Sequence, residues 1–305
     1  MPQGHYLAGC QVTAVRRLSS KKVIFVFSPK NKPAYTVENG ERVLVETRDC
    51  FSGKARSPKN LFEDIAMGNV NPATGPIAVK GLSAGETLCV SIEKIECGKT
   101  GVMMCSPNLG ILGGDVRRSR TKLVPIRGGK AVFSRDIGVA LNPHIGVIGV
   151  SPPKGEVPVF YPGDFGGNLD TVEAREGSKV YLPTFVDGGM VSLGDVHAAM
   201  GDGEVCGTGI EVPAEVTVSF ARIDEFQLRR PMIETPTEWI SFAAAKTLDE
   251  AAKLATYDLV RFISNMRGID FEEAYMLASA AANLRISQVV DPLMATRMSI
   301  SKKYL

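Results

Sequence analysis

One stretch of the chain, "SLGDVHAAMGDGEVCGTGIE" at residues 192–211, collects side chains that could do chemistry. It holds one of the three histidines of the protein together with four carboxylates and five glycines. Carboxylate oxygens beside one imidazole nitrogen suit zinc, or another divalent cation where oxygens dominate. A spare carboxylate next to such a cation could act as a general base. An acidic turn beside a hydrogen-bonded core histidine would have the same composition, so both interpretations stay open.

A second group of polar residues stands in "YPGDFGGNLD". Its Gly166 and Gly167 can let the backbone approach a ligand closely, or supply a positive φ for a turn. Asn168 and Asp170 are two residues apart, so in an extended segment their side chains point to one side. Asp49 ends an apolar run in "ETRDCFSG", where a carboxylate is either a ligand or a rim residue.

A pair of strands would bring the first group together. "MVSLGDVHA" predicts a strand, so Asp195 and His197 should project from the same face of it. The Asp-Gly dipeptide that follows predicts a tight hairpin turn. The returning strand "EVCGTGIEV" would carry Glu204 and Glu211 back past the first one. The pattern therefore predicts that imidazole and carboxylates meet at one end of a sheet.

The residues before 236 predict a mainly β fold. "KKVIFVF", "ERVLVETRDCF", "ETLCVSIEKIEC" and "AEVTVSFARI" are strand-like runs separated by glycine and proline. In the last run Val216, Val218 and Phe220 alternate with small or polar residues, which predicts one buried face. Regular strands of this kind favour a β-sandwich or barrel over a parallel α/β sheet. We expect one β-sandwich domain over residues 1–235.

Residues 236–305 change to a helical pattern. "TLDEAAKLATYDLVRFISNMRG" has Thr247 as a predicted N-cap, Glu250 three residues later as the second half of a capping box, and Gly268 at its end. A second helix, "DFEEAYMLASAAANLRIS", should begin at Asp270. The sequence therefore predicts a C-terminal helical hairpin that packs on the sandwich or on a partner subunit.

The overall composition excludes several classes of protein. The 305 residues are 44% hydrophobic and carry 35 basic against 33 acidic side chains, so we expect neither nucleic acid nor a membrane surface as a partner. No apolar run reaches the roughly 18 residues that span a bilayer, and the start of the chain has no leader-like pattern. The six cysteines form no CxxC pair, which favours reduced thiols and a cytoplasmic protein.

The same motifs resemble those of a known family. "GGNLD" followed by "LPTFVDGGMVSLGDVHAAMGDGEVCGTGIEV" resembles the acetamidase/formamidase family, whose pattern runs GGN-x-D, an LPV-like strand, then GD-x-HA-x-QGDGEV and an acidic strand end. "TRDCFSG", "NPATGPIAV" and "IGVIGVSPP" stand in the same order, so the resemblance covers residues 15–225. Met200 stands where the family usually has glutamine, which would favour a different or more apolar amide. His144 stands where a hydrophobic residue is common.

The resemblance implies a jelly-roll-like β-sandwich that hydrolyses a short-chain amide to a carboxylate and ammonia. The acidic and histidine positions of the family fall on Asp49, Asp170, Asp195, His197, Glu204 and Glu211. From their chemistry we expect a divalent metal, zinc first and calcium or another divalent ion second, with all of these except Glu204 as ligands. Glu204 is the expected general base, and Asp202 is a further catalytic candidate. Gly166, Gly167 and Asn168 would orient the amide or its oxyanion.

Two rival hypotheses remain open at this point. A thiol mechanism would use Cys206, although the segment offers no obvious group to activate it. A non-catalytic jelly-roll could instead bind a ligand around a structural cation, since the fold alone does not decide function. The number of acids around His197 exceeds what one closed zinc site needs, which favours the enzyme. We expect a small amide as the partner and a homodimer as the assembly.

Overall fold

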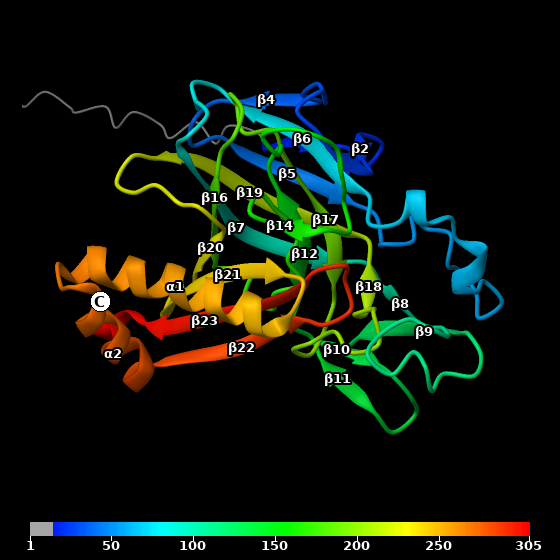
Figure 1. The fold of residues 1–305 in the computed structure, drawn as a ribbon. Coiled ribbons are helices and arrows are strands. Elements are labelled where there is room, and N and C mark those ends of the chain that lie inside the picture. The colour runs from blue at the N-terminus through cyan, green and yellow to red at the C-terminus, as the bar shows by residue number, and fades with distance from the viewer. Residues whose placement is uncertain (1–14) are drawn as a thin grey trace, which may run out of the picture.

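A computed structural model describes residues 15–305 as two large β-sheets that face each other, with two helices near the C-terminus (Figure 1). The expected mainly β, jelly-roll-like sandwich with a C-terminal pair of helices is confirmed. The first 14 residues, which include the start of the chain and Cys10, lie outside the described residues. Among residues 15–305 no helix is long and apolar enough to cross a membrane.

The first sheet has nine strands and runs from the N-terminal to the C-terminal part of the chain. In spatial order they are β1 (Arg16–Leu18), β5 (Arg42–Thr47), β19 (Ala214–Ile223), β7 (Thr87–Cys97), β16 (Lys179–Pro183), β20 (Met232–Glu234), β21 (Glu238–Ala245), β23 (Met294–Ser301) and β22 (Ala282–Gln288). The long strand β19 pairs antiparallel with β5 on one side and β7 on the other.

The second sheet has twelve strands and contains the conspicuous polar motifs. Its main path is β11 (Gly138–Ala140), β10 (Lys130–Val132), β9 (Arg120–Arg127), β8 (Thr100–Cys105), β18 (Glu211–Val212), β17 (Val191–His197), β12 (His144–Gly149), β15 (Gly166–Asn168) and β14 (Pro162–Gly163). Branching from β17 are β6 (Ala73–Val79), β2 (Val23–Ile24) and β4 (Tyr35–Val37), while β3 (Val26–Phe27) and β13 (Val157–Pro158) form a separate pair.

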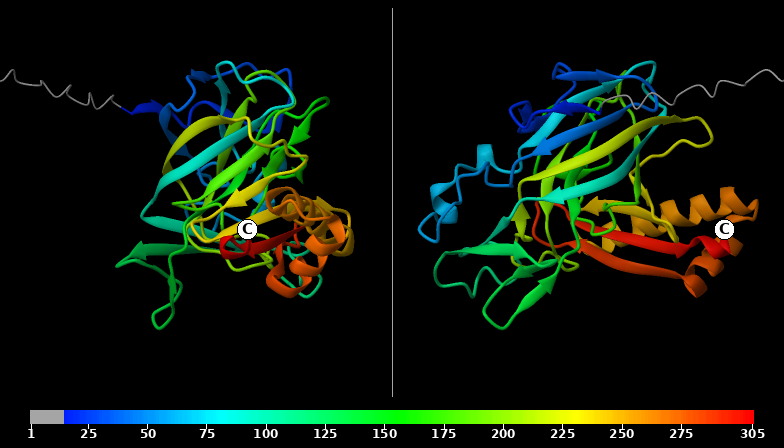
Figure 2. Two further views of the ribbon diagram at one scale, coloured as in Figure 1. Left: turned by 90° about the vertical axis from the view of Figure 1, so that its left-hand side faces the viewer. Right: turned by 180° about the vertical axis from the view of Figure 1, so that it is seen from behind.

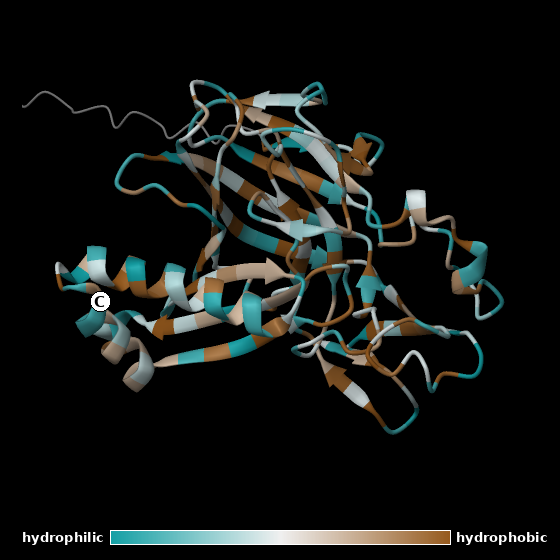
Figure 3. Cartoon of the chain, viewed as in Figure 1, coloured by the Kyte–Doolittle hydropathy of each residue, from teal (hydrophilic) through white to brown (hydrophobic). Residues whose placement is uncertain are grey.

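The main hydrophobic core lies between the two sheets. The side chains of Val216, Val218 and Phe220 on β19 are buried in it, whereas Thr217 and Ser219 between them are partly exposed. The predicted period of two is therefore confirmed, because successive side chains of a strand point to opposite faces. In Figure 3 hydrophobic and hydrophilic stretches alternate along many strands in the same way.

The two helices begin where the capping residues predict. Helix α1 (Leu248–Arg267) has the Thr247 side chain accepting from the backbone N–H of Glu250, and Gly268 ends it in the left-handed conformation. Helix α2 (Phe271–Ala281) has Asp270 accepting from the backbone N–H of Glu273. The helices cover one end of the nine-stranded sheet with a second hydrophobic cluster, on the side opposite the projecting segment 52–70 (Figures 1 and 2).

The end of the predicted second helix is wrong. The structure ends α2 at Ala281 and continues with β22 at the edge of the nine-stranded sheet. Asn283 and the β-branched Ile286 are poor helix formers, and pairing with β23 outweighs what helical pattern remains. Residues 236–305 thus include three strands, and β21 pairs directly with β20 across the expected domain boundary at 235. The division of the chain into residues 1–235 and 236–305 stays a prediction.

Candidate active site

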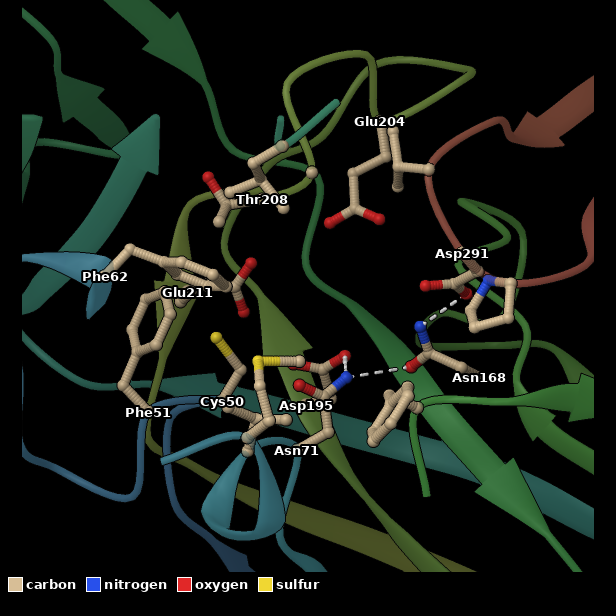
Figure 4. A pocket seen from close by; sticks show the side chains of 17 residues that line it. Cys50, Phe51, Phe62, Asn71, Asn168, Asp195, Glu204, Thr208, Glu211 and Asp291 are labelled. Carbon is tan, nitrogen blue, oxygen red and sulfur yellow. Dashed lines mark hydrogen bonds between the residues drawn. The ribbon is translucent and has the colours of Figure 1, made fainter. Parts of the chain in front are cut away.

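The twelve-stranded sheet carries a cavity of about 350 Å³ in which the acidic residues converge (Figure 4). Its polar side is formed by Asn71, Asn168, Asp195, Glu204, Glu211 and Asp291. Buried next to them are His197, which is 1% exposed, and Asp170, which is also 1% exposed. Five carboxylates and one imidazole therefore meet where the chain is shielded from water.

Strands β17 and β18 supply three of these groups. His197 pairs with Glu211 across the two strands, and His197 Nε2 lies 3.2 Å from Glu211 Oε2. Asp195 stands two residues earlier on β17, with its Oδ1 3.7 Å from His197 Nε2. Asp195 has a φ of 53°, a left-handed conformation that carboxylate residues tolerate better than most. The prediction that Asp195 and His197 share a face is confirmed.

The tight hairpin expected at Asp202-Gly203 is wrong. After His197 the chain forms a loop over residues 198–210, and the returning strand β18 begins only at Glu211. Gly203 makes an isolated bridge to Gln288 near the end of β22. A local turn does form, with the Glu204 N–H donating to Gly201 O at 3.2 Å, but the bridge to Gln288 takes the place of pairing with a returning strand. Glu204, with a φ of 45°, then reaches the cluster from above, and its Oε1 lies 3.8 Å from His197 Nε2.

The other nitrogen of His197 is fixed by a second histidine. His144 Nδ1 lies 2.7 Å from the carbonyl oxygen of Asn142, which only accepts, so this nitrogen carries the proton. Burial lowers the pKa of His144 to about 3 and keeps the ring neutral, which leaves its Nε2 as an acceptor. That Nε2 lies 3.2 Å from His197 Nδ1, which therefore donates. His197 consequently presents Nε2 to the carboxylates.

Two glycines make room for the cluster. A Cβ on Gly146 of β12 would stand 2.7 Å from Asp170 Oδ1 and 2.9 Å from Asp195 Oδ2. A Cβ on Gly209 would stand 2.8 Å from Cγ of His197. Any larger residue would push these side chains away from one another. The backbone is thus built to let two carboxylates and the imidazole approach closely.

Asn168 at the end of β15 joins the carboxylates by its amide. Its Nδ2 donates to Asp170 Oδ2 at 2.5 Å and to Asp291 Oδ2 at 2.8 Å. Its Oδ1 accepts from Asn71 Nδ2 at 3.0 Å, and the same Asn71 nitrogen donates to Asp195 Oδ2 at 2.8 Å. Because the side-chain amides of Asn71 and Asn168 both bond to carboxylates, they fix the positions of the carboxylate oxygens relative to one another (Figure 4).

Sequence reasoning missed Asp291 and Asn71 as site residues. Asp291 follows β22 in the loop before β23, and its own backbone N–H donates to the buried Gln288 side chain at 2.9 Å. Nothing in its local pattern, "VVDPL", distinguishes it from an ordinary loop aspartate. Asn71 opens "NPATGPIAV", which contributed to the family resemblance without being assigned to the site, and in the structure it has a φ of 48°.

The crowding disfavours the charged carboxylates. Burial, reinforced by neighbouring carboxylates, raises the pKa of Asp170, Glu204 and Asp291 well above the usual range. Burial likewise raises the pKa of Glu211 to about 7, although His197 opposes the shift. For His197 burial works against the charged form, but Glu211 and Asp195 outweigh it and raise its pKa. The cluster therefore needs positive charge, from protons or from a cation.

Four buried atoms of the cluster lack a hydrogen-bond partner among the described residues. They are Asp170 Oδ1, Asp195 Oδ1, His197 Nε2 and Glu211 Oε2. Unpaired buried polar atoms cost free energy, and they are rare unless an ion or water satisfies them. Ligand atoms of Asp170, Asp195 and His197 lie within 4.8 Å of one another, as do those of His197, Glu204 and Glu211. This donor set fits a divalent cation.

Several residues selected from the sequence lie elsewhere. Asp49 accepts from the backbone N–H groups of Phe51 and Gly53 and shapes a turn; it does not line the cavity. Asp202 is turned away, and its Oδ1 accepts from Arg297 Nη2 at 2.6 Å. Gly166 and Gly167 pack between strands, where a Cβ would stand 2.4 Å from Ile148 O and 2.3 Å from Tyr161 O respectively.

Two further positions were singled out by the sequence, Cys206 and Met200. The thiol of Cys206 lies 3.6 Å from the carbonyl oxygen of Thr208 and does not line the cavity. Met200 is partly exposed and is also absent from the described cavity wall. The proposed effect of Met200 on substrate choice therefore has no direct contact to act through.

Comparison with known proteins decides the family. The sequence model of the Acetamidase/Formamidase family matches residues 20–159 and 157–302. The chain belongs to the acetamidase/formamidase family. The resemblance seen in the sequence motifs is thereby confirmed, and it extends through the C-terminal strands that the motifs did not cover. Membership in this family indicates a hydrolase of amide bonds.

Solved structures of acetamidases share the whole architecture of this family member. The acetamidase of Bacillus halodurans is 41% identical and superposes with a TM-score of 0.93, covering 94% of this chain and 98% of that one. The acetamidase of Yersinia enterocolitica is 28% identical with a TM-score of 0.90, covering 96% and 94%. A formamidase of Methylophilus methylotrophus is 34% identical over 104 residues, which are 30% of this chain and 25% of that protein.

Proposed function

We propose that this protein hydrolyses a primary amide to a carboxylate and ammonia in the cavity above β17, with the help of a divalent cation. The observation that carries the proposal is the set of four unpartnered buried atoms, from Asp170, Asp195, His197 and Glu211, of which Asp195 and Glu211 line the cavity and His197 joins the other two. Family membership supports the amide bond as the target. The relatives named acetamidase and formamidase support a short-chain amide.

The cation would be held by these four residues, three carboxylates and one imidazole. Zinc suits the imidazole and calcium suits a carboxylate-rich site, so we propose zinc first and another divalent ion second. His144 keeps His197 in the tautomer that offers Nε2, as second-shell partners of metal-bound histidines commonly do. When bound, a divalent cation polarises a carbonyl and lowers the pKa of water.

Glu204 is the proposed general base. It lines the cavity with its Oε1 3.8 Å from His197 Nε2, and burial raises its pKa, which favours a carboxylate that accepts a proton. One water proton would pass to the Glu204 carboxylate as the water oxygen bonds to the amide carbon. The same proton would then pass to the amide nitrogen as the C–N bond breaks, which releases ammonia.

The rival hypothesis of a purely structural cation is less well supported. A structural site is closed by its ligands, whereas a catalytic site keeps an open position. Here Glu204 and Asp291 line an open cavity beside the donor set and add carboxylates that coordination does not require. The thiol hypothesis would need Cys206 to line the cavity, which it does not.

Metal removal tests the proposal. The purified protein is dialysed against a chelator, and ammonia release from acetamide and formamide is measured before and after zinc, calcium, manganese or magnesium is added back. We expect activity to vanish on chelation and to return with one of these ions in a ratio near one per chain. Full activity of protein shown to be free of metal by elemental analysis would refute the metal-dependent mechanism while leaving the amide hydrolase intact.

Assembly and location stay part of this proposal. We propose a homodimer in the cytoplasm, as expected from the helical hairpin and from the five free cysteines among residues 15–305. Sedimentation of the purified protein tests the dimer, and a monomer at micromolar concentration would refute it.

A further inference from the structure

Part of the cavity wall is apolar. We define its apolar wall as Phe51, Phe62, Val70, Leu109 and Phe160. Phe51 is 2% exposed and Val70 is 6% exposed, so packing holds these two side chains in place, while the other three are partly exposed. Figure 4 shows Phe51 and Phe62 on the side opposite Asn168 and Asp291.

The apolar wall belongs to a hydrophobic cluster of its own. Phe51 and Val70 pack with Met104 of β8 in a cluster separate from the core between the sheets, and Phe62 and Phe160 lie against it. Phe62 comes from the short 3₁₀ helix Phe62–Asp64 in the segment that projects from the sandwich. A rigid apolar surface of this kind contributes binding energy only to a ligand that covers it.

The size of the cavity exceeds the needs of acetamide. At about 350 Å³ it reaches the lower end of the range of small-molecule sites. A water molecule takes up about 30 Å³ in the liquid, so at that packing the cavity holds roughly ten non-hydrogen atoms. Acetamide would leave most of the space, including the apolar wall, in contact with water.

We infer that the preferred substrates are primary amides whose acyl group is a branched or linear alkyl chain, or a phenyl ring, that reaches the apolar wall. The inference rests on the amide hydrolase function proposed above. The amide group would lie at the carboxylate wall between Asp195 and Asn168, and the acyl group would extend toward Phe51 and Phe62. Acyl groups with a terminal carboxylate are excluded, because Glu204, Glu211 and Asp291 would repel them.

A chain-length series tests the inference. Formamide, acetamide, butyramide, hexanamide and benzamide are compared by kcat/KM for ammonia release, with the enzyme in its active metal form. We expect kcat/KM to rise about fourfold for each methylene that reaches the wall, which corresponds to about 0.8 kcal/mol per group. Benzamide should exceed acetamide by at least tenfold, and succinamate should be hydrolysed far more slowly than hexanamide.

Two substitutions in the apolar wall locate the effect. Val70→Phe fills the cavity and should lower the ratio of the hexanamide to the acetamide kcat/KM at least tenfold. Phe62→Ala removes part of the wall and should lower the same ratio. The two kcat/KM values are measured on the same preparation, so their ratio does not depend on the fraction of misfolded protein. A variant that folds poorly therefore still gives a valid ratio. Met200→Gln, outside the wall, should leave the ratio unchanged.

The outcomes separate this inference from the proposed function. Hydrolysis of acetamide with a kcat/KM equal to or above those of hexanamide and benzamide would overturn the inference and leave the amide hydrolase in place. A ratio of the hexanamide to the acetamide kcat/KM that stays unchanged in both Val70→Phe and Phe62→Ala would also overturn it. Hydrolysis of no amide in any metal form would overturn the proposed function and the inference together.

Discussion

The acidic groups of the cavity stand on two different kinds of backbone. Asp195, His197 and Glu211 project from β17 and β18 inside a sheet, where hydrogen bonds on both sides fix the chain. Glu204 and Asp291 stand on loops, and each loop is held by the other part of the chain. The strand-borne groups make up most of the proposed cation site, whereas the loop-borne Glu204 is the proposed general base.

The loops depend on the C-terminal segment. The Gly203 N–H donates to Ser287 O at 2.9 Å, and the Val289 N–H donates to Gly203 O at 3.1 Å. Arg297 on β23 is 1% exposed and pairs with Glu173 at 2.7 Å and Asp202 at 2.6 Å. The comparison teaches that residues 236–305 are no appendage, since they complete the site by placing Glu204 and supplying Asp291.

The largest effect is expected from a strand-borne ligand. Asp195→Asn keeps the size of the side chain but removes a charge from the donor set, so the protein should lose its cation. Activity should fall more than about 10⁴-fold, beyond the 10²–10⁴-fold that general acid–base catalysis alone supplies. Ammonia release and metal content are measured together. Asp136→Asn, on an exposed turn, is the matched control; retention of a full cation by Asp195→Asn would contradict the assignment.

A loop-borne carboxylate should behave differently. Glu204→Gln is expected to lower kcat by about 10²–10⁴-fold while the metal content stays near that of the parent, because Glu204 moves a proton and is not a required ligand. In Glu204→Gln only the rate should therefore fall, whereas in Asp195→Asn the rate and the metal content should fall together. If Glu204→Gln also lost the cation, the division between strand-borne and loop-borne groups would be wrong.

The tie between the C-terminal segment and the loop can be broken at Arg297. Arg297→Met leaves the buried Glu173 without its buried partner, with only the half-exposed Arg285 near it, which should lower the free energy of unfolding by about 3–5 kcal/mol. Denaturant unfolding measures the change. Arg285→Met is the control, because Arg285 is 45% exposed and lies 3.6 Å from the same Glu173; it should cost at most about 1 kcal/mol. Equal losses in the two variants would argue against a special role for Arg297.

The smallest effect is expected at His144, which contacts the strand-borne His197. His144→Leu leaves the N–H of His197 Nδ1 buried without its acceptor, so metal affinity should fall about 10–100-fold, as for other second-shell partners. Competition with a metal-binding dye measures the affinity. In His144→Gln a side-chain oxygen can accept the same proton, and much of the affinity should return. Unchanged affinity in His144→Leu would show that His197 needs no orienting partner.

Whether the sequence could predict a site residue depended on whether a strand or a loop carries that residue. Asp195, His197 and Glu211 were found because period-two spacing and a specific motif fix their faces locally. Asp291 lies far along the chain, in a loop held by the side chain of Gln288, and has no motif of its own. Asp202 and Asp49 were misplaced for the opposite reason: each is acidic and next to a motif, but its side chain bonds to Arg297 or to backbone N–H groups. Expecting α2 to run to residue 287 ignored the competing strand partner β23.

By itself the sequence determined the β-sandwich, the capped ends of α1, and the strand that bears Asp195 and His197, because alternation and capping act between near neighbours. The tertiary structure alone decided which carboxylates share the cavity, the placing of Glu204 by the C-terminal strands, and the apolar part of the cavity wall. Those contacts join different strands and loops, such as Gly203 with Ser287 and Val289, and only the packing of the folded chain brings them together.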